Sequence, residues 1–205
     1  SGLLQAETTK RYAGDYEAWA RASWKNIKEE ERGLYLSQRI NKYGKGAELA
    51  TYTLVNLQDI EFPFSYSFQY RIPQYPREVA DLMVFAVPGL LDYLTFPEAG
   101  LATRVYPIEY DTTEMQKDEG TVSLGEGLTI RSLPEPVRVD TPWFTFIGEY
   151  QREGDRAITY RFAFRRLAKR VELKDYPEFK RQIERVQKCA RDRIFLMKAT
   201  QGGKP

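Results

Sequence analysis

Residues 62–72 read FPFSYSFQYRI, and this stretch decides the fold. Aromatic and aliphatic residues fall on every second position, and proline, serine, glutamine and arginine stand between them. A period of two places alternate side chains on opposite faces of an extended chain. The stretch therefore predicts a β-strand with one aromatic face against a core and one polar face toward solvent.

Two further runs alternate in the same way. Residues 144–150 read FTFIGEY, and residues 158–165 read ITYRFAFR. Between them stands Glu153-Gly154-Asp155, in which glycine supplies the positive φ of a tight turn. The pattern predicts a β-hairpin. Shorter strands are predicted at 4–10, 48–55, 81–87, 103–110, 121–124, 128–133, 137–140 and 193–197.

Helical spacing is confined to the two ends of the chain. A first helix is predicted from Asp15, whose carboxylate can accept from free N–H groups of the first turn. A second is predicted over 29–41, with acidic residues in its first turn. The third starts at Asp175, with Glu178 as a capping-box partner. The predicted inward faces are Tyr16, Trp19, Ala20 and Ser23; then Leu36, Ile40 and Tyr43; then Phe179, Ile183, Val186 and Cys189/Ala190.

Many short strands without intervening helices predict a mainly β fold, an antiparallel β-sandwich or jelly-roll. Helices are expected near the N-terminus, and one at the C-terminus. We expect residues 1–46 to form an N-terminal strand and helical segment packed on the sandwich. Residues 47–198 form the β-sandwich body with the last helix and strand, and 199–205 a tail. One compact domain is expected overall.

Composition excludes several classes of protein. The chain has 205 residues, 42% hydrophobic and 14% aromatic with a net charge of +2, which excludes intrinsic disorder. Histidine is absent, so neither a Ser-His-Asp relay nor an imidazole metal site can form. A single cysteine excludes an intrachain disulfide. The longest apolar run, 84–91, is too short to span a membrane. We expect no cofactor, no metal and no transmembrane segment.

Charge is unevenly distributed along the chain. From residue 151 onward there are 16 Lys/Arg against 7 Asp/Glu, a net charge of +9, and the remainder carries −7. We interpret the basic end as solvated sheet edges and a helix face, with an acidic partner as the alternative. Its arginines alternate with aromatic residues and so face away from them. Nucleic-acid binding, which needs both on one face, is not expected.

Few residues offer chemistry. Cys189 is predicted to be a core residue, because no base or helix N-terminus stands near it to activate the thiol. Paired carboxylates could serve a glycosidase, but we interpret them as solvated loop residues. The acids in question are Asp111 with Glu114, Asp118 with Glu119, and Glu126.

Aromatic residues offer a possible contact surface. Residues 88–97 are unusually apolar for a loop. They either cap the open end of the sandwich or, if exposed, present Tyr93 and Phe96 to a sugar or a protein. Exposure of Tyr93, Phe96 and Trp143 would indicate a glycan- or protein-binding module, and their burial a scaffold. An independent module could also bind through the basic C-terminal region.

The chain begins Ser1-Gly2, without methionine or a signal-peptide pattern, which predicts a piece of a longer protein. The order of its motifs resembles the C-terminal domain of unknown function that follows a transglutaminase-like core in large bacterial proteins. The matching stretches are Gly14-Asp15-Tyr16 with Arg21, 55–60, the aromatic strand to Tyr70, 81–85, 104–108, 124–134 and 160–162.

The resemblance implies a non-catalytic accessory domain that packs on or positions the transglutaminase-like core of the same polypeptide. In such proteins a Cys-His-Asp site in that core carries the chemistry, and no residue here matches it. The resemblance also implies a periplasmic, secreted or envelope-associated protein.

Overall fold

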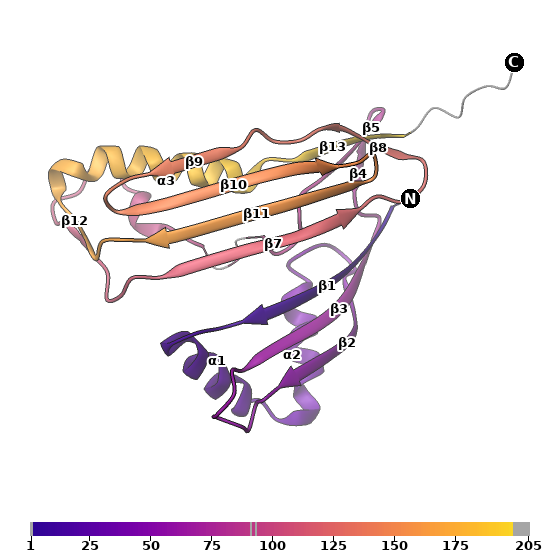
Figure 1. The fold of residues 1–205 in the computed structure, drawn as a ribbon, viewed down its shortest axis with the longest axis horizontal. Coiled ribbons are helices and arrows are strands. Elements are labelled where there is room, and N and C mark those ends of the chain that lie inside the picture. The colour runs from indigo at the N-terminus through magenta and orange to yellow at the C-terminus, as the bar shows by residue number, and fades with distance from the viewer. Residues whose placement is uncertain (1, 91, 93, 199–205) are drawn as a thin grey trace, which may run out of the picture. The chain divides into compact units, whose positions relative to one another are not determined.

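The computed structural model describes residues 2–90, 92 and 94–198. It is 41% strand and 23% helix, with antiparallel sheets, helices near the N-terminus and one C-terminal helix, so the predicted fold class is confirmed. The chain divides into two compact units, Ser1–Arg77 and Glu78–Pro205 (Figure 1). The predicted tail, 199–205, lies outside the described residues.

The first unit is a three-stranded antiparallel sheet with two helices. Its strand order is β1-β3-β2 (Figure 1). The alternating stretch forms β3, the central strand, whose inward rings Tyr66, Phe68 and Tyr70 lie 5.7–6.0 Å apart in sequence order. The elements are β1 (Leu3–Arg11), α1 (Asp15–Lys25), a 3-10 turn (Glu29–Glu31), α2 (Arg32–Ile40), β2 (Glu48–Val55) and β3 (Ser65–Pro73).

The helices complete the core of this unit, but α1 presents a different face from the one predicted. Trp19 is 78% exposed, whereas Trp24 is buried and its ring lies 4.8 Å from that of Tyr66. The buried face also includes Arg21, which a hydrophobic pattern assigns to solvent. Asp15 makes no capping hydrogen bond, because Gly14 occupies the N-cap position. In α2, the predicted stripe is confirmed at Leu36 and Ile40, and Tyr43 packs partly buried beyond the helix.

The second unit is built around a four-stranded antiparallel sheet of order β7-β11-β10-β9. The predicted hairpin is confirmed: Glu153 of β10 pairs with Ala157 of β11, and Gly154 has φ 63°. A second sheet has the order β4-β5-β13-β8, and β6 pairs with β12. The strands are β4 (Arg77–Val79), β5 (Leu82–Phe85), β6 (Ile108–Glu109), β7 (Met115–Ser123), β8 (Leu128–Ser132), β9 (Val137–Asp140), β10 (Phe144–Glu153), β11 (Ala157–Arg166), β12 (Arg170–Val171) and β13 (Ile194–Lys198).

Helix α3 (Tyr176–Arg191) packs on the aromatic face of the β7-β11-β10-β9 sheet. Phe179 meets Phe144 edge to face at 5.9 Å, and the predicted stripe is buried. The predicted capping box does not form: Asp175 has helical dihedral angles after the 3-10 turn Leu173–Asp175, and Glu178 bonds to Arg181 and Gln182 instead.

Several predicted boundaries differ from the structure; β7, for example, begins at Met115, six residues before the predicted strand 121–124. Strands β2 and β3 pair with each other and with β1, so they belong to the N-terminal unit and not to the body beginning at residue 47. The predicted strand 103–110 shortens to β6, residues 108–109. Residues 98–106, which begin in the 3-10 turn Pro97–Ala99, instead form a loop held by side-chain hydrogen bonds.

Candidate functional site

Of the three aromatic residues predicted as a possible contact surface, the structure describes two, and both pack against other rings. Tyr93 lies outside the described residues. Phe96 is only 4% exposed and packs 5.3 Å from Phe164. Trp143 is half-buried, and its ring meets Phe179 edge to face at 5.9 Å. The rings of Phe96 and Trp143 therefore serve the packing of this unit.

Cys189 is confirmed as a core residue. It is 2% exposed, and a β-carbon on Gly148 of β10 would lie 2.8 Å from its sulfur. Burial, with a smaller contribution from Asp192, raises the pKa of the thiol to about 11. A protonated, enclosed thiol is a poor nucleophile, so its environment suits packing.

Several of the acidic residues considered for hydrolysis are engaged in local pairs. Glu114 accepts from Arg166 at 2.6 Å, Glu119 lies 2.7 Å from Lys117, and Asp118 accepts from Gln116 at 3.2 Å. Among the residues that the structure describes, no group of three His, Cys, Asp or Glu is arranged to hold a metal ion.

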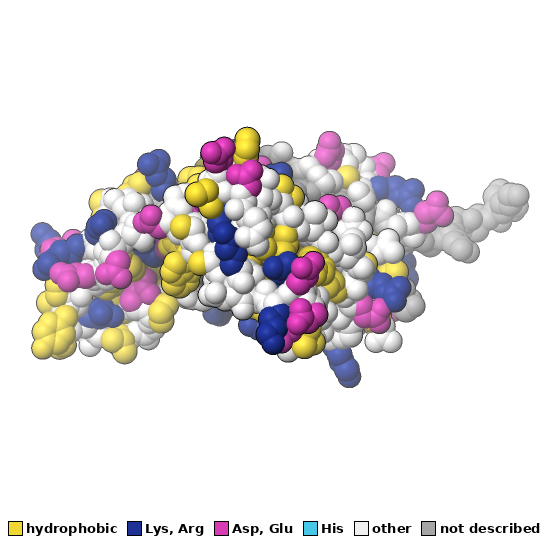
Figure 2. Space-filling model, turned by 90° about the horizontal axis from the view of Figure 1, so that it is seen from below, with side chains coloured by type: hydrophobic (Ala, Val, Ile, Leu, Met, Phe, Trp, Pro, Cys, Tyr) yellow, Lys and Arg dark blue, Asp and Glu magenta, His cyan; other side chains and the backbone are white. Residues whose placement is uncertain are grey.

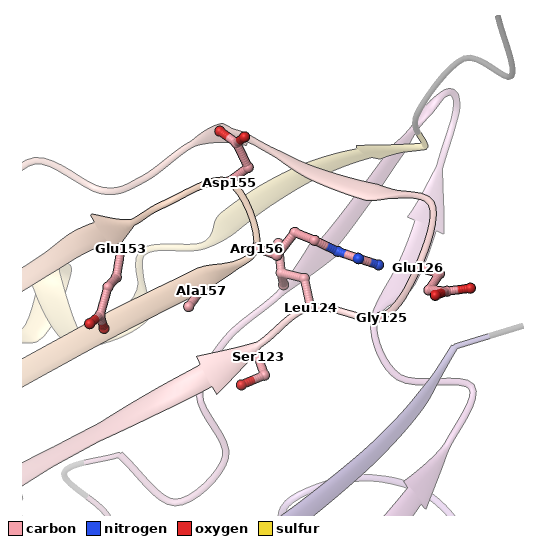
Figure 3. Close-up of a pocket in the computed structure, with 8 residues that line it drawn as sticks. All are labelled: Ser123, Leu124, Gly125, Glu126, Glu153, Asp155, Arg156 and Ala157. Carbon is pink, nitrogen blue, oxygen red and sulfur yellow. The ribbon is translucent and has the colours of Figure 1, made fainter.

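Two shallow hollows lie on the second unit. The larger, of about 620 Å³, lies where the β10–β11 turn meets the segment after β7. Figure 3 shows the carboxylates of Glu126, Glu153 and Asp155 pointing in different directions, so they do not converge on one point. The smaller hollow, of about 380 Å³, lies on strands β7, β10 and β11. It is lined by Glu119, Gly120, Thr121, Glu149, Gln151, Thr159, Tyr160 and Arg161.

A polar network of the second unit surrounds Arg166. Its side chain is 8% exposed, and its guanidinium donates to Glu114 and lies 3.5 Å from the ring centroid of Tyr110. The Tyr110 hydroxyl donates in turn to Glu98 at 2.5 Å. Burial first, and then the bond to Glu98, raise the pKa of Tyr110, which keeps its hydroxyl a donor. The network ties the end of β11 to the loop that begins at Glu98.

That loop, residues 98–106, is fixed by side chains that reach its backbone. The Tyr176 hydroxyl donates to the carbonyl of Leu101 at 2.7 Å, and Lys180 Nζ donates to the same oxygen at 2.8 Å. Arg104 donates within the loop to the carbonyls of Glu98 and Tyr106. Helix α3 therefore determines the conformation of the 98–106 loop.

The 98–106 loop exposes apolar side chains despite being well ordered by these bonds. Leu101 is 55% exposed, Val105 79% and Tyr106 75%; we call these three the tip residues. The sequence pattern did not predict this surface. In the predicted strand 103–110, Val105 and Tyr106 would face opposite sides, so only one of them would be exposed. A signal was present in Pro107, which interrupts such a strand.

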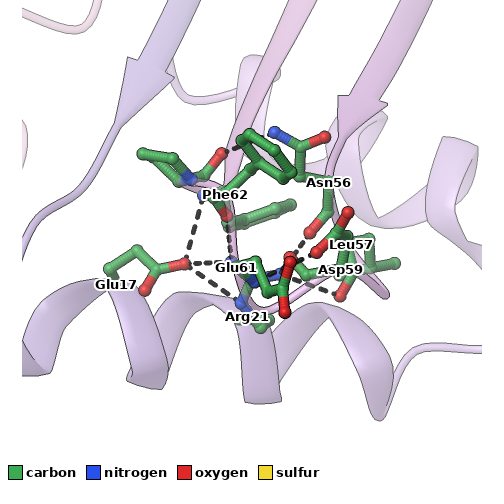
Figure 4. Close-up of polar contacts among 9 residues, drawn as sticks. Glu17, Arg21, Asn56, Leu57, Asp59, Glu61 and Phe62 are labelled. Atoms are coloured by element: carbon green, nitrogen blue, oxygen red, sulfur yellow. Dashed lines mark hydrogen bonds and ion pairs between the residues drawn. The ribbon is translucent and has the colours of Figure 1, made fainter.

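In the first unit, a buried side chain likewise holds the backbone of the turn between β2 and β3 by hydrogen bonds, as Figure 4 shows. The guanidinium of Arg21 donates to the carbonyls of Asn56, Leu57, Asp59 and Phe62. It also donates to Glu17, whose Oε1 accepts from the backbone N–H of Phe64 as well. The pKa of Glu17 is lowered, and the hydrogen bonds from Arg21 are the largest cause. One buried cation thus holds the turn from β2 to β3.

The uneven charge of the sequence is partly compensated within the fold. Cations of the basic end pair with acids earlier in the chain: Arg166 with Glu114, Arg170 with Glu109, and Lys198 with Glu78. On the face drawn in Figure 2, basic and acidic side chains lie beside one another. The pairs of Arg170 and Lys198 are exposed and fit the interpretation of the basic end as a solvated face, whereas Arg166 is buried.

The structure and the comparisons define the chain as a mainly β protein with a recognisable C-terminal unit. Residues 82–196, from β5 to β13, match the model of DUF3858, a domain of unknown function. The match covers more than half of the chain, which therefore belongs to this family. No curated protein and no solved structure matches the chain. No helix among the described residues is long and apolar enough to cross a membrane.

Proposed function

We propose that the chain is a non-catalytic accessory domain of a larger bacterial transglutaminase-like protein, in which it packs on or positions the catalytic core. The observation that carries the proposal is the 98–106 loop: polar side chains of α3 hold exposed apolar residues in a fixed conformation. Ordering such a loop costs conformational entropy, and a preordered apolar surface favours association with another protein.

The resemblance of the motifs supports the identity of the partner. Three of the stretches that carry it, 104–108, 124–134 and 160–162, lie inside the DUF3858 match. The domain would then accompany a transglutaminase-like core in the periplasm, at the cell envelope or outside the cell. An independent glycan- or protein-binding module is the alternative, and Tyr106 is then its exposed aromatic residue.

The test uses the parent polypeptide with and without this chain. We expect the chain, added back in trans or in cis, to raise the melting temperature of the core or to change its turnover of peptide substrates. A core that forms no complex with the chain and keeps the same stability and activity would contradict the proposal. Turnover of a peptide, ester or saccharide by the isolated chain would contradict its non-catalytic role.

A further inference from the structure

We propose that the tip residues Leu101, Val105 and Tyr106 form a protein-docking surface whose partner has an apolar depression with carboxylates at its rim. This inference rests on the proposed function, in which the partner surface belongs to the transglutaminase-like core. It adds the contact residues and the chemistry of the surface that they fit.

Exposure gives the first reason. Val105 and Tyr106 are adjacent and more than 70% exposed, and Leu101 is 55% exposed. Single exposed hydrophobic residues are common, whereas here three lie within six consecutive residues of one loop. Tyrosine with aliphatic neighbours matches the centre of protein interfaces, where a large ring is buried and its hydroxyl reaches a polar group.

Preordering gives the second reason. Phe96 and Ala99 are buried before the tip residues, and Ile108 is buried after them. Between these anchors the carbonyl of Leu101 accepts two hydrogen bonds from α3. A loop already held in its bound conformation loses less entropy when a partner binds. The two hydrogen bonds to Leu101 therefore stabilise the fold and also lower the entropy lost when a partner binds.

Charge gives the third reason and decides the chemistry of the rim. Arg104 donates to two carbonyl oxygens and lies 5.7 Å from the ring centroid of Tyr176, and within the described part of the chain it forms no ion pair with a carboxylate. Lys180 differs, because it forms an ion pair with Glu184 at 3.8 Å. Carbonyl oxygens satisfy the donors of Arg104 without neutralising its charge, so an acidic rim on the partner would complement Arg104.

A lipid surface fits the same loop less well. Anionic membranes typically recruit clusters of roughly 4–8 Lys or Arg side chains. Arg104 is the one Lys or Arg among residues 98–106, and Lys180 of α3 adds a second cation beside Leu101. We therefore favour a protein partner.

The experiment titrates the 205-residue chain with the separately produced transglutaminase-like core, by calorimetry. We expect the triple variant Leu101→Ser/Val105→Ser/Tyr106→Ser to bind at least about 100-fold more weakly, since interface anchors dominate affinity. The matched control is Val55→Ser/Ile60→Ser/Phe62→Ser, which removes three exposed hydrophobic residues of the other unit and should bind like the wild type.

A second variant separates preordering from contact. Tyr176→Phe keeps the ring and the tip residues but removes the hydroxyl that donates to Leu101. We expect faster hydrogen exchange in the 98–106 loop and roughly 3- to 10-fold weaker binding, with the domain still folded and its melting temperature lowered by only a few degrees. Unchanged exchange and affinity would show that the hydrogen bond has no positioning role.

The outcomes separate the two proposals. If the wild-type chain binds the core and the triple variant binds equally well, the docking surface is wrong and the proposed function stands. If the wild-type chain does not bind the core at all, both fail. If the chain instead binds vesicles of phosphatidylglycerol and phosphatidylcholine, and the triple substitution abolishes this, the surface contacts lipid and the inference is overturned.

Discussion

The guanidinium carbon of Arg166 lies 3.5 Å from the ring centroid of Tyr110. At this distance a cation is attracted by the π-electrons of the ring, most strongly where water is excluded. The side chain of Arg166 is 8% exposed, and Glu114, at 2.6 Å, supplies the opposite charge. The pair joins the end of β11 to the loop before β7 inside the family domain.

We expect Arg166→Met to lower the free energy of unfolding by about 3–5 kcal/mol, because it leaves the Glu114 carboxylate without its cation. Arg166→Lys should lose less, since it keeps the charge but not the planar fork. Urea unfolding followed by circular dichroism measures both. The double variant Arg166→Met/Glu114→Met is the informative comparison: a loss as large as the sum of the single losses would show that the two residues do not interact.

Arg21 should be the corresponding stability determinant of the first unit. Its guanidinium is shared by Glu17 and four backbone carbonyls of the β2–β3 turn. Arg21→Met should lower the free energy of unfolding of this unit by roughly 1–3 kcal/mol, because carbonyl oxygens of the β2–β3 turn lose their donor. Fluorescence of the buried Trp24 reports the transition during urea unfolding. The control is Lys25→Met, on the exposed side of the same helix; an equal effect of both substitutions would contradict a specific role of Arg21.

The sequence predicted the main strands of the fold better than the polar contacts that hold the loops. Period-two alternation correctly predicted the central strand β3 and the β10–β11 hairpin, because each buries one aromatic face. It could not predict that Arg21 is buried, since that depends on carbonyl oxygens about 40 residues away. Residue preference alone also mispredicts the helix caps. Asp15 and Asp175 have suitable side chains, but Gly14 takes the N-cap position of α1, and Asp175 has helical dihedral angles and makes no capping hydrogen bond.

The 98–106 loop was beyond local reasoning for the same physical cause. Its conformation depends on Tyr176, 75 residues later in the chain than Leu101. No window of sequence contains both partners. The exposed Val105 therefore resembles a strand residue until the contact from α3 is known.

Stability should depend on Glu17 at acid pH. Hydrogen bonds from Arg21, and a smaller one from the N–H of Phe64, lower the pKa of Glu17 below its ordinary value of 4.5, although partial burial opposes them. A carboxylate with a lowered folded-state pKa stabilises the protein fully above its unfolded-state pKa. This contribution is lost as pH falls through the lowered value. The unfolding midpoint of the wild type should therefore fall more steeply between pH 5 and 3 than that of Glu17→Gln.

Urea midpoints over that pH range, read from Trp24 fluorescence, test the prediction. The control is Asp15→Asn, an exposed residue in the first turn of the same helix. Parallel pH profiles for the wild type and Glu17→Gln would show that Glu17 does not contribute to acid sensitivity.

The contact between β10 and α3 leaves no room for a larger residue at Gly148. A β-carbon there would lie 2.8 Å from Cys189 Sγ and 2.9 Å from ring atoms of Phe146 and Phe162. Gly148→Ala should therefore destabilise the second unit by about 1–3 kcal/mol through overpacking. Adding Cys189→Ala removes the closest atom and should recover part of the loss. Thermal unfolding measures the series, and Gly125→Ala, where nothing lies within 4 Å, is the control.

The same packing predicts the reactivity of the single thiol. Cys189 is 2% exposed and its pKa is raised to about 11, so only roughly one thiol in a thousand is ionised at pH 8. Labelling by an aromatic disulfide reagent should be slow in the folded protein and should accelerate with urea as the second unit unfolds. Gly148→Ala should label faster than the wild type at the same urea concentration, because the destabilised core opens more often. Rapid labelling of the native wild type at the rate of a free thiol would show that α3 does not enclose Cys189.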